Sequence, residues 1–362
     1  MRAMTALASD SSLLAPITVG DIVANNRVFM APLTRSRATD DGVPTDLQVE
    51  YYRQRARAGL IIAEGTQPSQ VGKGYTNTPG LHTEAQQDGW ARIADAVHAE
   101  GGRIVVQLMH AGRMSHPDNS GHQSIAPSAI APAGAQMFTK TGMQDIPAPR
   151  ALDIDELPGV VADFVDASKR AVAAGLDGVE LHAANGYLLH EFLSNGENLR
   201  TDSYGGSAAN RARFVTEVVT AVAEAIGAER VGIRISPGHE AAGMTETDNW
   251  DTYAELLAQI DPLGLAYLHV LIAPDDPMLS KIRDAWSGEL VLNTGFGVLS
   301  ERDDMEALLA DGPADAVAVG RPYIANPDLV ERWTIGAELN EAQQATFYGG
   351  GAEGYTDYPT LN

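Results

Sequence analysis

The residues best suited to chemistry lie between Gly178 and Phe214. A short apolar run there ends at His182, and a polar stretch that contains Asn185 and Tyr187 follows it. If the run is a buried strand, two hydrogen-bond donors and a phenol share one strand-to-loop junction. In barrel enzymes that junction is where the chemistry takes place. This block therefore predicts the catalytic site.

Other polar residues stand at the ends of further apolar runs, and they limit the possible reactions. Glu64 is the one clear carboxylate among them, whereas a glycosidase needs two. The available histidines, His110, His182 and His269, contain no close-spaced pair for a metal, and no lysine stands at a strand end where a Schiff-base aldolase would need one. Hydrogen-bond donors remain: Thr34, Gln107, His182, Asn185 and Arg234. Donors without a nucleophile or a metal indicate that a bound cofactor does the chemistry.

Two glycine-containing segments near the end of the chain predict a phosphate site. Gly295-Phe296-Gly297 follows the seventh apolar run, and Gly320-Arg321 follows the eighth. Backbone N–H groups of such turns bind dianions, and Arg321 adds a positive charge. Phosphate sites of barrel enzymes are commonly built after these two strands.

The elements that must position these residues alternate between two patterns. Short, continuously apolar runs are typical of parallel strands buried on both faces. Helical stripes follow them; one runs from Leu157 to Val172, with Asp153 and Glu156 spaced as a capping box and Gly175 as its stop. The eight predicted strands are Arg27–Ala31, Leu60–Glu64, Arg103–Leu108, Gly178–His182, Val231–Ser236, Leu265–Leu271, Leu290–Asn293 and Ala314–Val319.

Eight strand–helix units predict an α/β fold, a single (β/α)8 TIM barrel that spans residues 11–362. Residues 1–10 are expected to be a flexible N-terminal segment. The exception to the even spacing is the proline-containing stretch from Gly112 to Arg150, after the third strand, which we interpret as a long loop insertion forming a wall of the active site.

Composition excludes several classes of protein. The chain has 362 residues and a formal net charge of −23, so we expect it to bind neither nucleic acid nor an anionic membrane. It contains no cysteine, which excludes disulfides and thiolate chemistry. No apolar run approaches the length of a membrane span, and the first ten residues do not resemble a signal peptide. A cytoplasmic protein without a metal site is therefore expected.

Several motifs in order make the chain similar to a known family. It resembles the Old Yellow Enzyme family of flavin-dependent ene-reductases, in particular bacterial members that act on nitroesters and activated alkenes. The resemblance covers essentially the whole chain, from about Leu14 to Leu361. Its motifs are Asn26-Arg27-Val28 with Ala31-Pro32-Leu33-Thr34-Arg35, Lys73-Gly74-Tyr75 with Pro79-Gly80-Leu81-His82, Val106-Gln107-Leu108, the block His182 to Phe214, Val231-Gly232-Ile233-Arg234, Gly320-Arg321 with Asn326-Pro327-Asp328-Leu329, and Tyr355-Thr356-Asp357-Tyr358-Pro359.

The resemblance implies a non-covalent FMN across the barrel mouth. Pro32 and Thr34 would contact the edge of the flavin ring, Gln107 its pyrimidine part, and Arg234 the side where negative charge develops on reduction. Gly65 would supply a backbone contact. The residues implied to hold the phosphate are Phe296, Gly297, Gly320 and Arg321.

The resemblance further implies a ping-pong hydride transfer from NADPH or NADH to an enone, a nitroalkene or a nitroester. His182 and Asn185 would bind the oxygen of this small-molecule substrate, and Tyr187 would protonate its α-carbon. Tyr75, Met109 and Tyr358 would line the substrate pocket. Met109 stands where some relatives carry Trp, which predicts a more open pocket wall. The resemblance leaves open whether the enzyme is a monomer or a dimer.

Two other functions remain open from the sequence. A phosphate-binding barrel lyase or isomerase could use His182 and Tyr187 as acid–base groups, and it would not need Thr34, Gln107 and Arg234. A non-catalytic flavin-binding protein would bind FMN without oxidising a nicotinamide.

Overall fold

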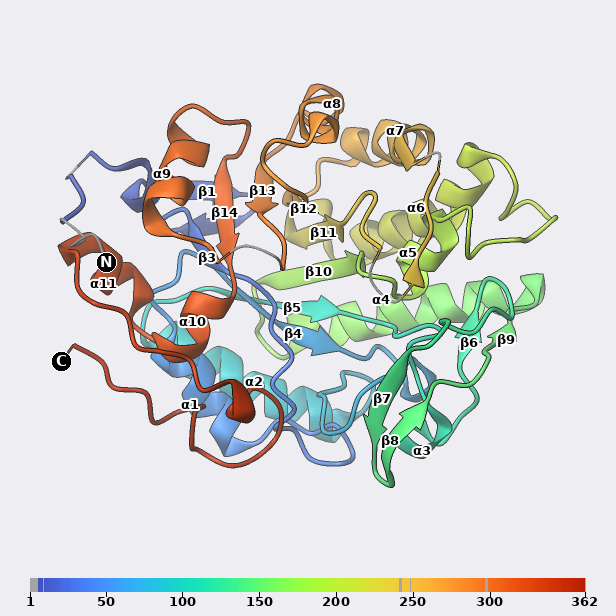
Figure 1. Cartoon of the computed structure of the whole chain (residues 1–362), viewed down its shortest axis with the longest axis horizontal. Coiled ribbons are helices and arrows are strands. Elements are labelled where there is room, and N and C mark those ends of the chain that lie inside the picture. The colour runs from blue at the N-terminus through green and yellow to red at the C-terminus, as the bar shows by residue number, and fades with distance from the viewer. Residues whose placement is uncertain (1–5, 9, 241–242, 248, 297–298, 362) are drawn as a thin grey trace.

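A closed barrel of parallel strands occupies the centre of the molecule (Figure 1). The structure is a computed structural model that describes residues 6–8, 10–240, 243–247, 249–296 and 299–361. Going around the barrel, the strands follow the order β10-β11-β12-β13-β14-β3-β4-β5. They are β3 (Val28–Met30), β4 (Ile61–Thr66), β5 (Ile104–Leu108), β10 (Gly178–Ala183), β11 (Val231–Ile235), β12 (Tyr267–Leu271), β13 (Leu290–Asn293) and β14 (Ala316–Val319).

Each of the eight predicted strands overlaps one strand of this barrel, so the predicted (β/α)8 fold is confirmed. Every residue of these strands is buried, because side chains point alternately into the barrel and against the surrounding helices. The apolar runs were continuous for this reason.

Helices surround the barrel and connect one strand to the next (Figure 1). The longer ones are α1 (Asp46–Gln54), α2 (Glu84–Ala99), α4 (Leu157–Ala173), α6 (Ala208–Ile226), α7 (Asn249–Ile260), α8 (Pro277–Ala285) and α9 (Arg302–Ala310). Two short helices, α10 (Arg321–Ala325) and α11 (Leu329–Ile335), follow the last strand. The predicted capping box precedes α4: the backbone N–H of Asp153 donates to the Glu156 carboxylate at 2.8 Å. Gly175, the predicted stop, has φ +83°, which ends the helical path.

The insertion after β5 has more structure than the sequence predicted. It contains the short helix α3 (Pro117–Ser120) and the antiparallel hairpin of β7 (Gln136–Thr139) and β8 (Gly142–Asp145). A further pair, β6 (Ile125–Ala126) and β9 (Arg150–Ala151), joins the two ends of the insertion. These strands of two to four residues are too short to produce a recognisable alternation of apolar and polar residues.

A second hairpin, also missed from the sequence, precedes the barrel. It consists of β1 (Ile17–Val19) and β2 (Ile22–Ala24). Its buried side chains join one core cluster with residues of the barrel interior such as Phe29. The interior is therefore filled beneath the site by packed side chains. Residues 1–5 and 9, most of the segment expected to be flexible, lie outside the described residues.

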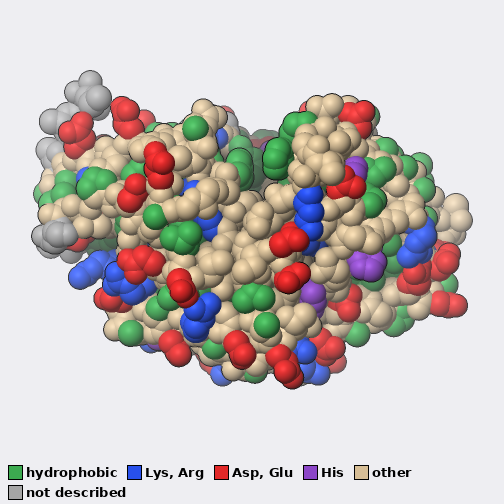
Figure 2. Space-filling model, turned by 90° about the horizontal axis from the view of Figure 1, so that it is seen from below, with side chains coloured by type: hydrophobic (Ala, Val, Ile, Leu, Met, Phe, Trp, Pro, Cys, Tyr) green, Lys and Arg blue, Asp and Glu red, His purple; other side chains and the backbone are tan. Residues whose placement is uncertain are grey.

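The surface carries charges of both signs. On the face that Figure 2 shows, acidic and basic side chains are scattered among one another, without a broad basic patch. No helix among the described residues is both long and apolar enough to cross a membrane.

Candidate functional site

A cavity opens at the carboxyl ends of the barrel strands and encloses about 740 Å³, its open mouth included. Its walls come from most of the barrel strands and from a segment near residue 348. The lining residues are Pro32, Leu33, Thr34, Arg35, Gly65, Gln107, Met109, His182, Asn185, Tyr187, Arg234, Phe296, Ile324, Phe347 and Tyr348. Most of the residues that the sequence singled out are thus brought together in one place.

His182 in β10 and Asn185, two residues after the end of this strand, both line the cavity and are buried. His182 is paired with Arg234 of the neighbouring strand β11. Asn185 has φ +57°, an unusual conformation for a residue other than glycine, and its backbone N–H donates to Ser236 Oγ at 2.9 Å. His182 Nδ1 and Asn185 Nδ2 have no hydrogen-bond partner among the described residues. Two unpartnered buried polar atoms at a cavity indicate that a bound molecule supplies the partner.

The imidazole of His182 stays neutral at physiological pH. Burial, together with the positive charge of Arg234, holds its pKa well below the usual value. A neutral imidazole can donate one hydrogen bond to a substrate oxygen without adding a charge.

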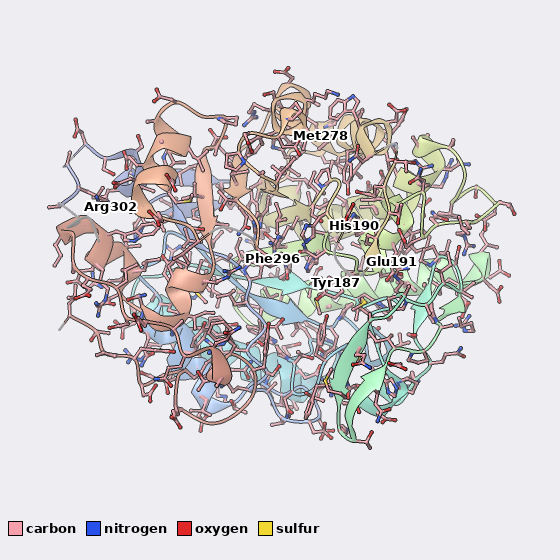
Figure 3. All side chains as sticks on the ribbon, viewed as in Figure 1. Tyr187, His190, Glu191, Met278, Phe296 and Arg302 are labelled. Atoms are coloured by element: carbon pink, nitrogen blue, oxygen red, sulfur yellow. The ribbon has the colours of Figure 1, made fainter. Side chains whose placement is uncertain are left out.

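Tyr187 lies directly before the short helix α5 (Leu188–Leu193), and its ring meets the His182 ring edge-on at 4.9 Å between centroids. Its hydroxyl oxygen lies 3.0 Å from that of Tyr75. Burial raises the pKa of Tyr187 well above its usual value, so the phenol keeps its proton. Figure 3 shows Tyr187 and Phe296 near the middle of the molecule, while Met278 and Arg302 lie toward its periphery.

One wall of the cavity depends on a close approach between Gly65 and Met109. A Cβ atom at Gly65 would lie 2.7 Å from the Met109 sulfur, so a larger residue there would push this side chain out of place. Pro32 and Thr34 follow β3 on the adjacent side. The Met109 side chain, for which the sequence predicted a more open pocket wall than Trp would give, is thus part of this wall.

Beneath the cavity, Gln107 belongs to a hydrogen-bonded group that the sequence analysis missed. Its side-chain Nε2 donates to Glu180 at 2.7 Å, and the other Glu180 oxygen lies 2.8 Å from His269 Nδ1. Glu180 and His269 are fully buried in the barrel. A charged residue in the middle of a predicted buried strand was the signal that could have revealed this group.

The predicted phosphate site is described in part. Phe296 lines the cavity, and Gly320 precedes helix α10, whose first residue is the exposed Arg321. Gly297 lies outside the described residues. The N–H of Gly295, one of the groups proposed to bind the dianion, instead donates to the Asn293 side chain at 3.1 Å.

Of the two tyrosines predicted to line the substrate pocket, Tyr75 is not a lining residue itself but contacts the Tyr187 hydroxyl, and Tyr358 does not belong to the cavity wall. It packs with Ile324 and Ala325, and its hydroxyl accepts a hydrogen bond from the Gln343 N–H at 2.9 Å. Phe347 and Tyr348 line the cavity from the same C-terminal segment. A coil that folds back carries no periodicity that could distinguish these residues in the sequence.

Arg35 fixes this segment beside the cavity. Its Nε donates to the Phe347 carbonyl at 2.8 Å and its Nη2 to the Gly354 carbonyl at 2.9 Å, while the Gly349 N–H donates to the Arg35 carbonyl at 3.0 Å. Tyr355 stacks on Tyr51 with a centroid distance of 4.2 Å.

The residues of the cavity fit FMN. Arg234 is buried, and its Nε has no partner among the described residues, so a group that gains negative charge on reduction would satisfy it. Apolar side chains such as Leu33 and Phe296 offer the walls that a flat ring requires. The described residues contain no group of three or more metal-ligating side chains that could hold a metal ion.

Comparison with known proteins agrees with the fit of this cavity to FMN. Residues 12–340 match the model of the NADH:flavin oxidoreductase / NADH oxidase family. A probable flavin mononucleotide-dependent alkene reductase from Leishmania infantum is 41% identical over 359 residues, covering 96% of this chain and 97% of the relative.

Two solved structures are similar over nearly the whole chain. Morphinone reductase in complex with tetrahydroNAD superposes with a TM-score of 0.93 at 48% identity, covering 98% of each chain. The Old Yellow Enzyme homologue from Zymomonas mobilis superposes with a TM-score of 0.93 at 41% identity, covering 97% of this chain and 100% of the other.

Proposed function

The chain belongs to the NADH:flavin oxidoreductase / NADH oxidase family, and from this membership we propose that it reduces the C=C bond of alkenes conjugated to a carbonyl or nitro group. It is an FMN-dependent oxidoreductase that uses a reduced nicotinamide, NADH or NADPH. FMN, when bound, would supply the redox chemistry that links oxidation of the nicotinamide to reduction of the alkene.

One observation carries the choice of substrate class. Within the part of the chain that the structure describes, His182 Nδ1 and Asn185 Nδ2 are buried without partners, and the His182 ring meets the ring of Tyr187 edge-on. Both residues line the cavity, and two side-chain N–H donors there match an oxygen that becomes more negative as the double bond is reduced. The same pair serves the carbonyl oxygen of an enone and a nitro oxygen, so we include nitroalkenes among the substrates. A nitroester offers the same nitro oxygen but no C=C bond, and we include it as a second substrate class in which hydride transfer releases nitrite and leaves the alcohol.

We assign the contacts with the flavin ring to the cavity wall formed at the ends of β3, β4, β5 and β11. In this assignment Pro32, Thr34 and Gly65 hold one edge of the flavin ring, while Gln107 and Arg234 hold the pyrimidine part. Phe296, Gly297, Gly320 and Arg321 hold the phosphate. Arg234 stabilises negative charge electrostatically, because it is buried where water cannot screen it.

The proton is delivered by Tyr187. Its raised pKa keeps the hydroxyl protonated, and a phenol is acidic enough to protonate the strongly basic α-carbon of a developing enolate. Tyr75 accepts or donates the hydrogen bond that holds this hydroxyl in place. Met109 and Phe296 line the same cavity.

The two other functions considered from the sequence are less well supported. A lyase or isomerase that acts on a phosphorylated substrate would not need the hydrogen-bond donors Thr34, Gln107 and Arg234, which line the cavity. A flavin carrier leaves the acid at Tyr187 and the two donors beside it without a use.

Anaerobic spectroscopy of the purified protein tests the proposal. The protein should be yellow, NADH or NADPH should bleach it, and 2-cyclohexenone or a nitroalkene should restore the colour. A preparation that is colourless and does not take up added FMN contradicts the proposal. A yellow protein that a nicotinamide reduces but no activated alkene reoxidises contradicts the substrate class alone.

A further inference from the structure

Glu180 is a buried carboxylate below the cavity that the proposed reaction does not use. Its side chain is fully buried and accepts from Gln107 Nε2 at 2.7 Å and from His269 Nδ1 at 2.8 Å. Strand register explains the grouping, because Gln107 lies opposite Glu180, and Arg234 lies opposite both His182 and His269. Residues two apart on a strand point to the same face, so Glu180 and His182 share the barrel interior.

The carboxylate is charged. Burial alone would raise the pKa of Glu180, but the electrostatic interaction and hydrogen bond with His269, the positive charge of Arg234 and the hydrogen bond from Gln107 outweigh it, and the pKa lies below its usual value. An ionised carboxylate offers only acceptors, so the group that Gln107 turns toward it must be the amide N–H2.

The hydrogen bond to Glu180 therefore fixes which end of the Gln107 amide faces the cavity. With Nε2 committed to the carboxylate, the carbonyl oxygen Oε1 is left for a bound molecule. Gln107 Oε1 can accept a hydrogen bond from a ring that presents an N–H to it. A ring that presents only an acceptor to Oε1 would bind less well.

We propose that Glu180, held by His269, is a positioning residue that orients the Gln107 amide toward FMN and balances the charge of Arg234. This inference rests on the proposed function, since it assumes that FMN occupies the cavity. Glu180 lies below the cavity wall and acts through the two residues that line it. It thereby limits how strongly Arg234 favours the more negatively charged, reduced form of the cofactor.

The midpoint potential of bound FMN tests this role, because a purely structural residue would not move it in a defined direction. In Glu180→Gln the charge of Arg234 is no longer balanced, so we expect the potential to rise above that of the wild type. Glu180→Asp keeps the charge but shortens the reach to Gln107. We expect its potential to stay near the wild-type value and its Kd for FMN to increase by roughly three- to tenfold, as for the loss of one hydrogen bond.

Glu64→Gln is the matched control. Glu64 is equally buried in the barrel wall, but its carboxylate accepts from Gln48, Tyr52 and the Arg35 backbone, and from neither Gln107 nor Arg234. We expect its effect on the potential to be clearly smaller than that of Glu180→Gln. Equal shifts in the two variants would show a general effect of losing a buried carboxylate and would overturn the inference.

Other results would also overturn it. An unchanged or lowered potential in Glu180→Gln excludes the charge balance, and a wild-type Kd for FMN in Glu180→Asp excludes the orientation of Gln107. If Glu180→Gln does not fold, the affinity of Glu180→Asp decides. Failure of the proposed function is recognised separately, because the wild-type protein itself would then bind no FMN.

Discussion

The hydroxyl oxygens of Tyr187 and Tyr75 lie 3.0 Å apart, so the two phenols share a single hydrogen bond at the edge of the cavity. Their rings meet edge-on, with centroids 6.4 Å apart. Tyr75 belongs to the chain between β4 and α2, whereas Tyr187 precedes α5. Segments that follow two different barrel strands, β4 and β10, thus hold the Tyr187 hydroxyl in position.

Replacing Tyr187 with Phe should separate the two halves of the reaction. The variant lacks the proton donor but keeps the cavity, so reduction of the enzyme by a nicotinamide should proceed at nearly the wild-type rate. Oxidation by 2-cyclohexenone should slow by about 10²- to 10⁴-fold, the usual contribution of a positioned acid. Stopped-flow absorbance of the flavin measures both steps. An unchanged rate of oxidation by the alkene would exclude Tyr187 as the acid.

Tyr75→Phe is the control for that experiment. It removes the neighbouring hydroxyl and leaves the acid in place. The loss of one neutral hydrogen bond predicts a decrease of about two- to tenfold in the same alkene step. If this variant lost as much activity as Tyr187→Phe, the proton would have to be assigned to the pair.

Replacing His182 with Ala and Asn185 with Gly should abolish the binding of phenols. Glycine is chosen for position 185 because Asn185 has a positive φ, which alanine would adopt only with strain. Each lost hydrogen bond to a phenolate oxygen should weaken binding by about 10- to 100-fold. The measurement is the long-wavelength charge-transfer absorbance on titration with a simple phenol. Tight phenol binding in the double variant would show that the oxygen is held elsewhere.

Arg321→Ala should discriminate between FMN and riboflavin. Arg321 is exposed, so we expect a modest increase of roughly two- to fivefold in the Kd for FMN. Riboflavin lacks the phosphate, and its affinity for the apoprotein should not change. Fluorescence quenching during titration gives both constants. An equal loss for the two flavins would place Arg321 away from the phosphate.

Glu191 should make the stability of the protein depend on pH. This residue of α5 is buried, its Oε2 has no partner among the described residues, and burial raises the pKa to about 8. The unfolded chain releases the same proton near pH 4.3. Between these two pH values Glu191 is protonated in the folded protein and ionised in the unfolded chain. The free energy of unfolding therefore decreases as the pH rises from about 4.3 to about 8.

Glu191→Gln resembles the protonated side chain and should remove this part of the pH dependence. Between pH 6 and pH 9 we expect the free energy of unfolding of the wild type to fall by more than that of the variant, by on the order of a few kcal/mol. Urea denaturation followed by circular dichroism measures the difference. Parallel pH profiles for the two proteins would contradict the raised pKa.

The barrel was predictable from the sequence because buried parallel strands are apolar throughout. The run at Gly178–His182 corresponds to β10 (Gly178–Ala183), and the stop at Gly175 has the backbone conformation that its position required. Strand ends in a barrel converge, so His182, Asn185, Gln107 and Arg234 could be assigned to one site before any contact was known.

The remaining features depend on contacts between distant segments. Glu180 was missed because a strand pattern does not tell which polar partner an inward side chain will meet. Tyr358 was expected at the cavity, where the structure places Tyr348, since the course of a returning coil depends on Arg35 and on the stacking of Tyr355 with Tyr51. The hairpin β7–β8 was missed because its strands have only four residues each.

The hydrogen bonds between Arg35 and the C-terminal segment have a consequence for biosynthesis. A residue directly after Thr34 binds the carbonyl groups of Phe347 and Gly354, more than 300 positions later in the chain. All eight barrel strands are therefore synthesised before the segment with Phe347 and Tyr348, which forms this side of the cavity. A nascent chain can form the barrel while its mouth is still incomplete, and uptake of the cofactor in its final surroundings must wait until translation has passed this segment.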